Sequence, residues 1–370
     1  MTDLEQKPRL RFKGFTEAWE QRKVNEIVSY TSSSLSAKDA VDDGKWNLYD
    51  ANQLIGKTNL FFVRDDYITI IKDGAGVGRV RILPKNSAFI GTMGALLSFN
   101  SDLLFDFALL TKADLSSKFS GSTIPHIYFK DYGNEIYRVP SLFEQQKIGT
   151  LFEHLDSLIT LHQRKYDKLL AVKKALLEKM FPADGDPVPK IRFKGFSDAW
   201  EQCKLSDIAE RFDNLRIPVA ANLRIAGSTP YYGANGIQDY VDGYTHDGEF
   251  VLVAEDGAND LKNYPVQYVK GRIWVNNHAH VLQGKAKILD NRFLTYVINQ
   301  ADIESLLVGC GRAKLNAETM MNIVLPIPAI KEQQIIGCCL SKLDNLITLH
   351  QRQLEKLKNI KSALLEKMFV

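Results

Sequence analysis

Two glycine-containing segments of this 370-residue chain come close to known nucleotide-binding patterns. The run ANQLIGKT at 51–58 resembles a phosphate-binding loop, but alanine stands where the pattern needs its first glycine. The glycines of DGAGVGR at 73–79 have the wrong spacing for a dinucleotide site, and we interpret this segment as a turn that follows a strand at 67–71. Neither segment predicts nucleotide binding.

Catalytic motifs are missing from the sequence. It contains no HExxH, no GxSxG and no Asn-Pro-Pro-aromatic tetrad of the kind used for amino-methyl transfer. The run EDGANDLK at 255–262 has carboxylates and a lysine that a nuclease could use, but the related segment DGA at 73–75 lacks that set. The run NNHAH at 276–280 could serve as turn residues or as a weak metal pair. We therefore expect neither catalytic residues nor a metal site.

Composition places the chain among folded proteins of more than one domain. It is 45% apolar and 25% charged, and its length exceeds that of one ordinary core. No run of about 18 apolar residues or secretory signal is visible, and the four cysteines form no CxxC pair. We expect a cytoplasmic protein. The net charge of +3 allows a nucleic-acid partner only through a local basic patch.

The chain is an internal duplication. RLRFKGFTEAWEQR at 9–22 returns as KIRFKGFSDAWEQC at 190–203, and residues 144–181 return as 332–369 with LITLHQR and ALLEKMF unchanged. The offset grows from 181 to 188, and the intervening segments match only weakly. Repeated supports that carry diverged segments predict two modules that do the same kind of work on two different targets. Because the order is cyclic, we expect residues near Pro8 to pack near Phe369.

Each copy of the second motif predicts one long helix. The copies contain no proline, and their seam is apolar or aromatic at heptad spacing apart from one histidine. At about 1.5 Å per residue such a helix is about 57 Å long and needs a partner helix, for which the other copy is the obvious choice. The predicted seam includes Leu155, Ile159, His162, Leu343, Ile347 and His350.

The two seam histidines are interpreted as residues that set helix register, because one histidine per helix gives too few ligands for a metal. Basic pairs such as Arg164-Lys165 fit a solvated face or a docking surface for helices of a partner subunit. The predicted organisation is a first module at 1–141, a helix at 142–181, a linker at 182–189, a second module at 190–328 and a helix at 329–370.

The two motifs, each present twice in the same order, resemble the specificity subunit of type I restriction–modification systems, the HsdS family. In the variable segments the likeness is limited to placement and to patterns such as YYGANGIQDYVDG at 231–243. The resemblance implies a mixed α/β fold with two globular target-recognition domains, separated by two long antiparallel coiled-coil helices in a pseudo-two-fold internal repeat.

The same resemblance implies a function. Each domain would read one half of a bipartite target in double-stranded DNA, and the helices would set the spacer and dock two methyltransferase subunits. The chain itself would be non-catalytic and would hold no cofactor. S-adenosylmethionine and ATP are expected in the methyltransferase and restriction subunits.

Candidate DNA contacts are the Arg, Lys, Asn, Ser, Thr, His and Tyr residues on loops that the repeat places alike. Such side chains read base edges or hold phosphates. In the first module they are Ser32, Ser33, Ser34, Lys38, Lys72, Arg79, Thr92, Ser122, Thr123 and His126. In the second they are Arg216, Asn222, Arg224, Tyr231, Asn235, Asn259, Lys262, Asn276, Asn277, His278, Arg312 and Lys314. The loops around Gly121 and Gly309–Gly311 rank highest.

Two other classes of protein remain open at this point. A coiled-coil scaffold that binds two protein partners without reading DNA would have the same seam, and salt-dependent duplex binding would separate it from a DNA reader. A DNA-cleaving enzyme is disfavoured, because the chain lacks a repeated carboxylate cluster. The bases recognised and the spacer length cannot be read from the sequence.

Overall fold

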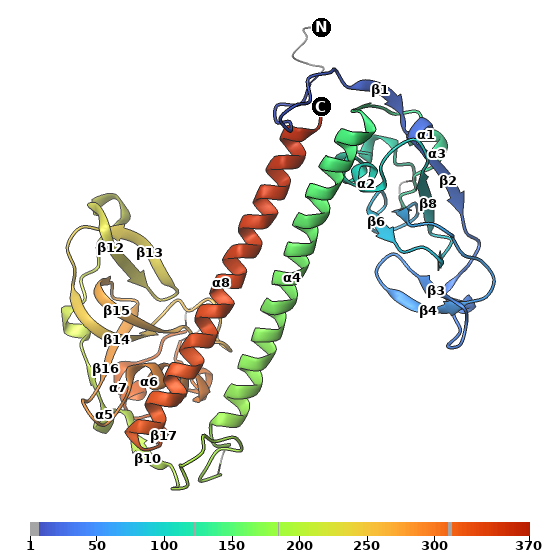
Figure 1. The fold of residues 1–370 in the computed structure, drawn as a ribbon. Helices are drawn as coiled ribbons and strands as arrows, with labels where there is room; N and C mark the ends of the chain where they lie inside the picture. The colour runs from blue at the N-terminus through green and yellow to red at the C-terminus, as the bar shows by residue number, and fades with distance from the viewer. Residues whose placement is uncertain (1–6, 122, 184, 310–312) are drawn as a thin grey trace. The chain divides into compact units, whose positions relative to one another are not determined.

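The computed structural model describes residues 7–121, 123–183, 185–309 and 313–370 (Figure 1). The chain divides into two compact units. Unit 1 comprises Met1–Arg164 and Gln351–Val370, and unit 2 comprises Lys165–His350. Each unit holds one mixed α/β module together with a segment of each of the two long helices.

Unit 1 builds its module from three small sheets. β1 (Glu20–Lys23) pairs with β9 (Ile136–Val139). The four-stranded sheet has the order β2 (Val28–Ser32), β8 (Met93–Ser98), β5 (Tyr67–Ile71) and β6 (Val80–Leu83). The three-stranded sheet has the order β4 (Leu54–Thr58), β3 (Trp46–Tyr49) and β7 (Ser87–Phe89). The short helices are α1 (Val24–Ile27), α2 (Leu103–Lys112) and α3 (Phe129–Tyr132), with the 3-10 turns η2 (Ala37–Asp39) and η3 (Ser116–Lys118).

Unit 2 repeats this plan with a larger sheet. β10 (Glu201–Lys204) pairs with β17 (Val324–Ile327). The six-stranded sheet has the order β11 (Ala209–Arg211), β16 (Ala279–Gly284), β14 (His246–Ala254), β15 (Val266–Val275), β12 (Ala226–Gly233) and β13 (Gly236–Val241). The short helices are α5 (Leu205–Ile208), α6 (Asn291–Gln300) and α7 (Ala317–Met321), with the 3-10 turns η4 (Asp213–Leu215), η5 (Ala221–Leu223) and η6 (Glu304–Leu306).

Pro84 and Asn86 explain why unit 1 has two separate sheets where unit 2 has one six-stranded sheet. In unit 2 the ten-residue strand β15 pairs with β14 along its length and with β12 at its end, so it joins both groups of strands. In unit 1 the corresponding stretch is split into β6 and β7 around Pro84 and Asn86. Proline cannot donate a ladder hydrogen bond, and Asn86 has a positive φ of 55°, which strand geometry does not allow. The four- and three-stranded sheets of unit 1 therefore remain separate.

The two long helices are α4 (Leu142–Met180) and α8 (Ile330–Met368), each of 39 residues. Each contains one glycine, Gly149 or Gly337, set against the first turn of α2 or α6. A Cβ on either glycine would lie 2.8 Å from a backbone nitrogen, that of Phe105 or Phe293, so only glycine permits this approach. Within the described ranges, no helix is both long enough and apolar enough to cross a membrane.

Buried ion pairs explain why the two sequence motifs are repeated together. Arg11 of the first motif makes a two-pronged pair with Glu144 of the second, with both nitrogen–oxygen distances at 2.7 Å. Arg192 and Glu332 repeat the pair at 2.7 and 2.8 Å. Both glutamates are fully buried. Because an unpaired buried carboxylate is strongly destabilising, each arginine is needed wherever its glutamate is present.

The expected cyclic closure of the chain is confirmed within the described residues. In unit 2 the Ile191 amide donates to the Lys179 carbonyl at the end of α4, at 2.8 Å. In unit 1 the Leu10 amide donates to the Lys367 carbonyl at the end of α8, at 2.9 Å. Trp19 packs on Phe369 as Trp200 packs on Phe181. The N-terminal motif is therefore held by the end of α8, as its repeat is held by the end of α4.

Inside each unit α4 and α8 contact each other, and the predicted seam residues are buried or partly buried. Leu155, Leu343 and Ile347 are buried, whereas Ile159, His162 and His350 are partly buried. In unit 1, Phe152 contacts Phe369 and Asp156 pairs with Lys361, so the two helices run in opposite directions there. In unit 2, Lys173 pairs with Asp344 at 2.6 Å.

Candidate nucleic-acid interface

In unit 1 two predicted DNA-contacting loops meet at Asp73 and His126. The backbone of His126 pairs with Ser120 and forms a bridge with Asp73. The His126 Nδ1 atom lies 2.7 Å from an Asp73 carboxylate oxygen. The Ile127 amide donates to the Lys72 carbonyl at 2.9 Å. The glycine turn at 73–79 and the segment at 120–126 therefore form one surface.

Unit 2 joins the corresponding loops through the same backbone contacts. Lys314 pairs with Val308 and forms a bridge with Asp256, and the Leu315 amide donates to the Glu255 carbonyl at 2.7 Å. Lys314 thus takes the place of His126, and Glu255 takes the place of Lys72. The side chains differ although the loop arrangement is the same, which is the pattern expected when two related readers have different targets.

Most of the unit 1 candidates lie on the surface. Ser32, Ser34, Lys38, Arg79, Thr92 and Thr123 are exposed, Ser33, Lys72 and His126 are partly exposed, and Ser122 lies outside the described residues. The Arg79 guanidinium donates to the Ala51 carbonyl and to the Asn52 side chain, so it holds a neighbouring turn. The Ser33 hydroxyl accepts from the Leu35 amide.

In unit 2 the exposed candidates are mainly amide side chains. Asn222, Asn235, Asn259, Lys262 and Asn277 are exposed, His278 is partly exposed, and Arg312 lies outside the described residues. The Asn235 amide group donates to the Gly257 carbonyl and accepts from the Asn259 amide, both at 2.9 Å. This contact holds the turn that presents Asn259. The His278 Nδ1 atom lies 2.6 Å from Asp256.

Burial corrects two unit 2 candidates, Tyr231 and Asn276, and two more have partly buried side chains. Tyr231 is 1% exposed and its hydroxyl bonds to the backbone of Val219, so its ring belongs to the core. Asn276 is 4% exposed and accepts from the His278 amide, which makes it a turn residue. The Arg216 and Arg224 side chains are each 14% exposed. Arg224 lies over the Tyr231 ring, with the guanidinium carbon 4.1 Å from its centre. Tyr231 and Asn276 therefore belong to the core and to a turn, while Arg216 and Arg224 are held by contacts with neighbouring loop residues.

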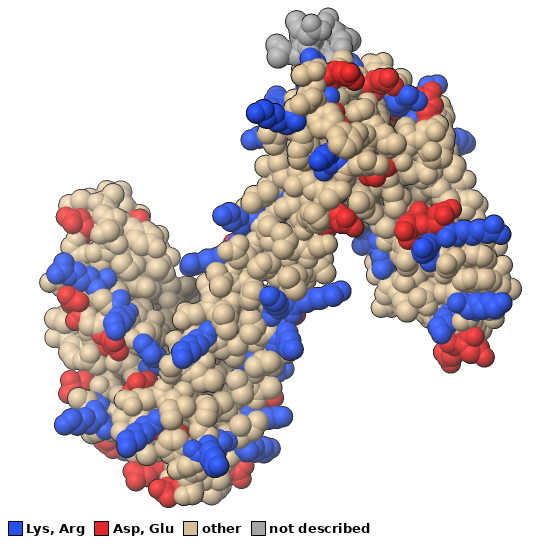
Figure 2. Space-filling model, in the orientation of Figure 1, with Lys and Arg blue, Asp and Glu red and all other residues tan. Residues whose placement is uncertain are grey.

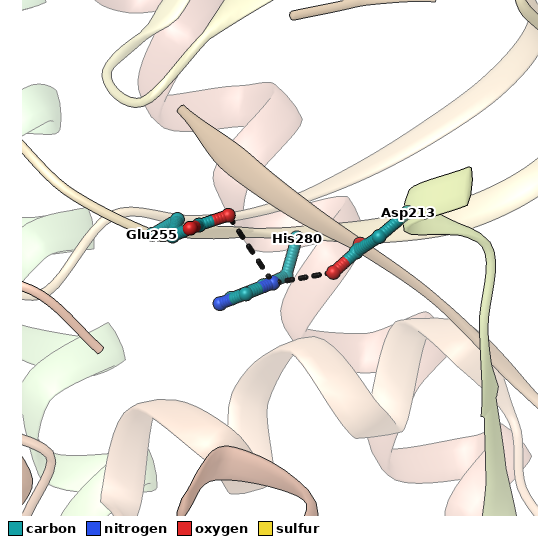
Figure 3. Close-up of side chains that lie close together, drawn as sticks. All are labelled: Asp213, Glu255 and His280. Carbon is teal, nitrogen blue, oxygen red and sulfur yellow. Dashed lines mark hydrogen bonds and ion pairs between the residues drawn. The ribbon is translucent and has the colours of Figure 1, made fainter. Parts of the chain in front are cut away.

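A buried cluster of charges lies beneath the unit 2 loops (Figure 3). The Nδ1 atom of His280 is 2.7 Å from a carboxylate oxygen of Asp213 and 3.7 Å from one of Glu255. Arg216 and Lys314 contact the two Glu255 oxygens at 2.7 and 2.8 Å. Burial raises the pKa of Asp213, but the hydrogen bond from His280 and the charge of Arg216 outweigh burial and hold it below its usual value.

The cluster does not fit a metal ion. Three of its groups could act as ligands by type and distance. However, the Arg216 guanidinium and the Lys314 ammonium already occupy both Glu255 oxygens, and these two cations would repel a bound metal. Sequence reasoning considered Glu255 and His280 separately and did not identify Asp213. The only signal for Asp213 was its place directly after a short strand.

Basic and apolar side chains lie together along the long helices. Residues 164–174 of α4 contain five Lys or Arg residues and one Asp. Residues 352–361 of α8 contain four Lys or Arg residues and one Glu. Figure 2 shows blue side chains along this part of the surface. Exposed apolar residues recur at equivalent positions: Leu158, Leu161 and Ile360 in unit 1, and Leu346, Leu349 and Val172 in unit 2.

Comparisons with known proteins agree on one family. The family model of the type I restriction modification DNA specificity domain matches residues 16–171 and 197–359. A type I restriction enzyme specificity subunit of Haemophilus influenzae is 47% identical over 142 residues, which cover 38% of this chain and 37% of that protein. The type I restriction enzyme MjaVIII specificity subunit of Methanocaldococcus jannaschii is 23% identical over 94% of this chain and 91% of its own length.

A solved structure shares the fold along nearly the whole chain. The S subunit of a type I restriction–modification system from M. genitalium covers 98% of this chain and 99% of its own. The TM-score is 0.71 at 18% sequence identity, so this likeness speaks to the fold alone.

Proposed function

This chain belongs to the family of type I restriction modification DNA specificity domains, and from that premise we propose that it is the DNA specificity subunit of a type I restriction–modification complex. The observation that carries the proposal is the pair of loop surfaces. Both units join an Asp-Gly-Ala turn to a second glycine-containing loop through the same backbone contacts, yet the side chains that these loops carry differ. Each unit would then read its own half of a bipartite target in double-stranded DNA.

The reading surface of unit 1 would use the exposed residues of its two joined loops. Lys72 makes no ion pair with any other described residue and lies beside the Asp73–His126 contact, so we assign it to a phosphate or a guanine edge. In unit 2 Glu255 takes the place of Lys72, and the exposed Asn259 and Asn277 lie on the two turns next to it, with Asn235 holding the Asn259 turn. Amide side chains pair with adenine edges, so unit 2 would read bases mainly through uncharged side chains, whereas unit 1 would also use a lysine.

The spacer between the half-sites would be set by α4 and α8. We assign them to one antiparallel coiled coil with pseudo-two-fold symmetry, because an ion pair in unit 1 and another in unit 2 occupy repeat-equivalent positions. The recognition domains would be residues 1–141 and 190–328, joined to the helices by the linker at 182–189. At about 1.5 Å per residue, 39 residues span about 58 Å, which is longer than one turn of DNA at about 34–36 Å.

Two methyltransferase subunits would dock on the helices. The exposed Leu158, Leu161 and Ile360 of unit 1 match the exposed Leu346, Leu349 and Val172 of unit 2. In unit 2, Val172 and Leu346 also line an apolar groove with Cys338 and Cys339. The repetition of one surface fits two copies of one partner, and the neighbouring lysines favour partner helices with acidic side chains. Catalysis, with S-adenosylmethionine and ATP, would belong to the partner subunits in the cytoplasm.

The test is the methylation motif of cells that carry this chain with its methyltransferase partner. We expect a motif with two short halves and an unread gap. Lys72→Ala should relax one half and Asn259→Ala the other, whereas Lys85→Ala, an exposed lysine between β6 and β7, should change neither. A phosphate contact would instead weaken binding to all sequences and reduce the salt slope by about one.

One outcome would favour a different function. If the purified chain and its partner bind each other but show no salt-dependent binding to duplex DNA and leave no methylation motif, the chain is a scaffold for protein partners. A motif in which one substitution alters both halves would contradict the assignment of one half-site to each unit.

A further inference from the structure

Four of the five surface segments that carry the unit 2 candidates contribute to the charge cluster or directly adjoin it. Arg216 begins the segment that carries Asn222, and Glu255 directly precedes the turn that carries Asn259. His280 lies in β16 just after Asn277 and His278, and Lys314 follows the glycine loop at 309–311. Five charged groups therefore connect these four segments to one another.

The hydrogen bonds of His280 fix its charge. Its Nε2 atom lies 2.9 Å from the Leu315 carbonyl oxygen, which can only accept. Its Nδ1 atom lies 2.7 Å from Asp213, whose carboxylate also accepts. Both ring nitrogens must therefore carry protons, which makes the ring an imidazolium. The ring is 1% exposed, so its charge is balanced by Asp213 and Glu255 rather than by water.

We propose that the cluster of Asp213, Arg216, Glu255, His280 and Lys314 positions the DNA-reading loops of unit 2 and thereby determines the specificity of one half-site. This inference rests on the proposed function. His280 acts as a positioning residue, because its two hydrogen bonds tie β16 to η4 through Asp213 and to residues 313–315 through the Leu315 carbonyl. Glu255 ties the neighbouring turn to the same residues through Lys314.

The repeat confines this role to unit 2. The strand pairings show which unit 1 residues correspond to the cluster. Gly94 takes the place of His280, and Ser32, its partner in the ladder, takes the place of Asp213. Lys72 takes the place of Glu255. Serine, lysine and glycine cannot form this network. Unit 1 instead has the side-chain contact between Asp73 and His126, whose side chains are about one third exposed. Loss of the His280 hydrogen bonds should therefore affect one half-site and leave the other intact.

The experiment compares His280→Gln with His246→Gln in the complete complex. His246 is a matched control, because it is also buried in the unit 2 sheet but bonds to Thr245 and to the Phe212 carbonyl, whereas His280 bonds to the Asp213 carboxylate and to Leu315. The rate of methylation is measured on the cognate duplex and on duplexes with one mismatch in either half. We expect His280→Gln to reduce discrimination in one half by about tenfold while the other half and the control are unchanged.

Thermal unfolding of the two variants separates positioning from general packing. His280→Gln should reduce discrimination in one half-site while its melting temperature falls no further than that of His246→Gln, because both histidines are buried and hydrogen-bonded. Equal effects of the two substitutions on folded protein, or equal effects on both halves, would overturn the inference. If the unsubstituted complex reads no bipartite sequence at all, the proposed function itself fails.

Discussion

Lys361 of α8 places its ammonium nitrogen 2.5 Å from a carboxylate oxygen of Asp156 in α4. The repeat offset of 188 carries Asp156 to Asp344 and Lys173 to Lys361, and Lys173 pairs with Asp344 at 2.6 Å. Each long helix therefore contributes one acid and one base, and the same contact forms once in each unit. When two copies of one helix sequence pair in opposite directions, every contact between them occurs twice, which explains why the ion pair is repeated.

Charge substitutions at this contact test the helix register. Lys361→Glu should reduce the free energy of unfolding by about 1 kcal/mol, because it removes a partly exposed ion pair and sets two like charges together. Adding Asp156→Lys should restore most of the loss. Urea denaturation measures both effects, and Lys358→Glu, on the exposed side of the same helix, is the control. The register would be wrong if the double substitution were as unstable as the sum of the two single ones.

Leu155 of the seam and Leu158 of the proposed docking surface lie three residues apart on α4. One substitution at each position therefore distinguishes helix packing from partner binding. Leu155→Asp should destabilise the chain by several kcal/mol, because it buries an unpaired charge. Leu158→Asp should leave stability nearly unchanged, because Leu158 is exposed, but it should weaken binding of the methyltransferase subunit. Leu343→Asp and Leu346→Asp should repeat the contrast in unit 2.

Thermal unfolding of the isolated chain and sedimentation of the complex measure the two effects. If Leu155→Asp melts like the parent, the helices do not pair through this face. If Leu158→Asp binds the partner normally, the exposed apolar residues are not the docking surface.

A buried carboxyl group makes the stability of unit 1 depend on pH. Asp106 is fully buried, and burial raises its pKa to about 7 although Ser101 and Ser98 donate to it. The Ser101 hydroxyl lies 2.6 Å from Asp106 and 2.7 Å from the Gln145 side-chain oxygen, but it has one proton. All these contacts are satisfied when Asp106 is protonated and donates to Ser101.

The sign of the effect follows from the raised pKa. Protonated Asp106 stabilises the folded state at low pH, and this contribution is lost as the pH rises from about 4 through about 7. The full change is about 4 kcal/mol, since the pKa rises by about three units. Asp106→Asn should match the parent at pH 4 and exceed it in stability at pH 8. A constant difference between the two proteins across this range would contradict the account.

The long helices and the repeated motifs can be predicted from the sequence, whereas most of the proposed DNA-contacting surface cannot. Heptad spacing indicated both helices. The cyclic order of the motifs indicated that the N-terminal motif lies near the end of α8, where Leu10 contacts Lys367. The pairing of Arg11 with Glu144 was hidden, although both residues lie in repeated motifs, because pairing across 133 positions leaves no local signal. The split of the unit 1 sheet at Pro84 was not foreseen either.

The candidate loops were located better than the side chains they present. Tyr231 and Asn276 have the residue types that contact DNA, but their strands and turns direct them inward. Arg216 illustrates the same limit, because a buried arginine and an exposed one look alike in sequence. Burial depends on which segments pack together, and in the diverged modules the single sequence gives no pattern that fixes this packing.

If two recognition units are held apart by a helical spacer, shortening the spacer should change the gap between the half-sites and nothing else. Removing residues 161–167 from α4 and the facing 350–356 from α8 deletes one heptad from each helix. The spacer should shorten by about 10 Å, or about three base pairs, with a small rotation because seven residues fall just short of two turns. The account predicts a methylation motif with the same two halves and a gap shorter by about three base pairs. A motif whose half-site letters change, with the gap unaltered, would contradict it.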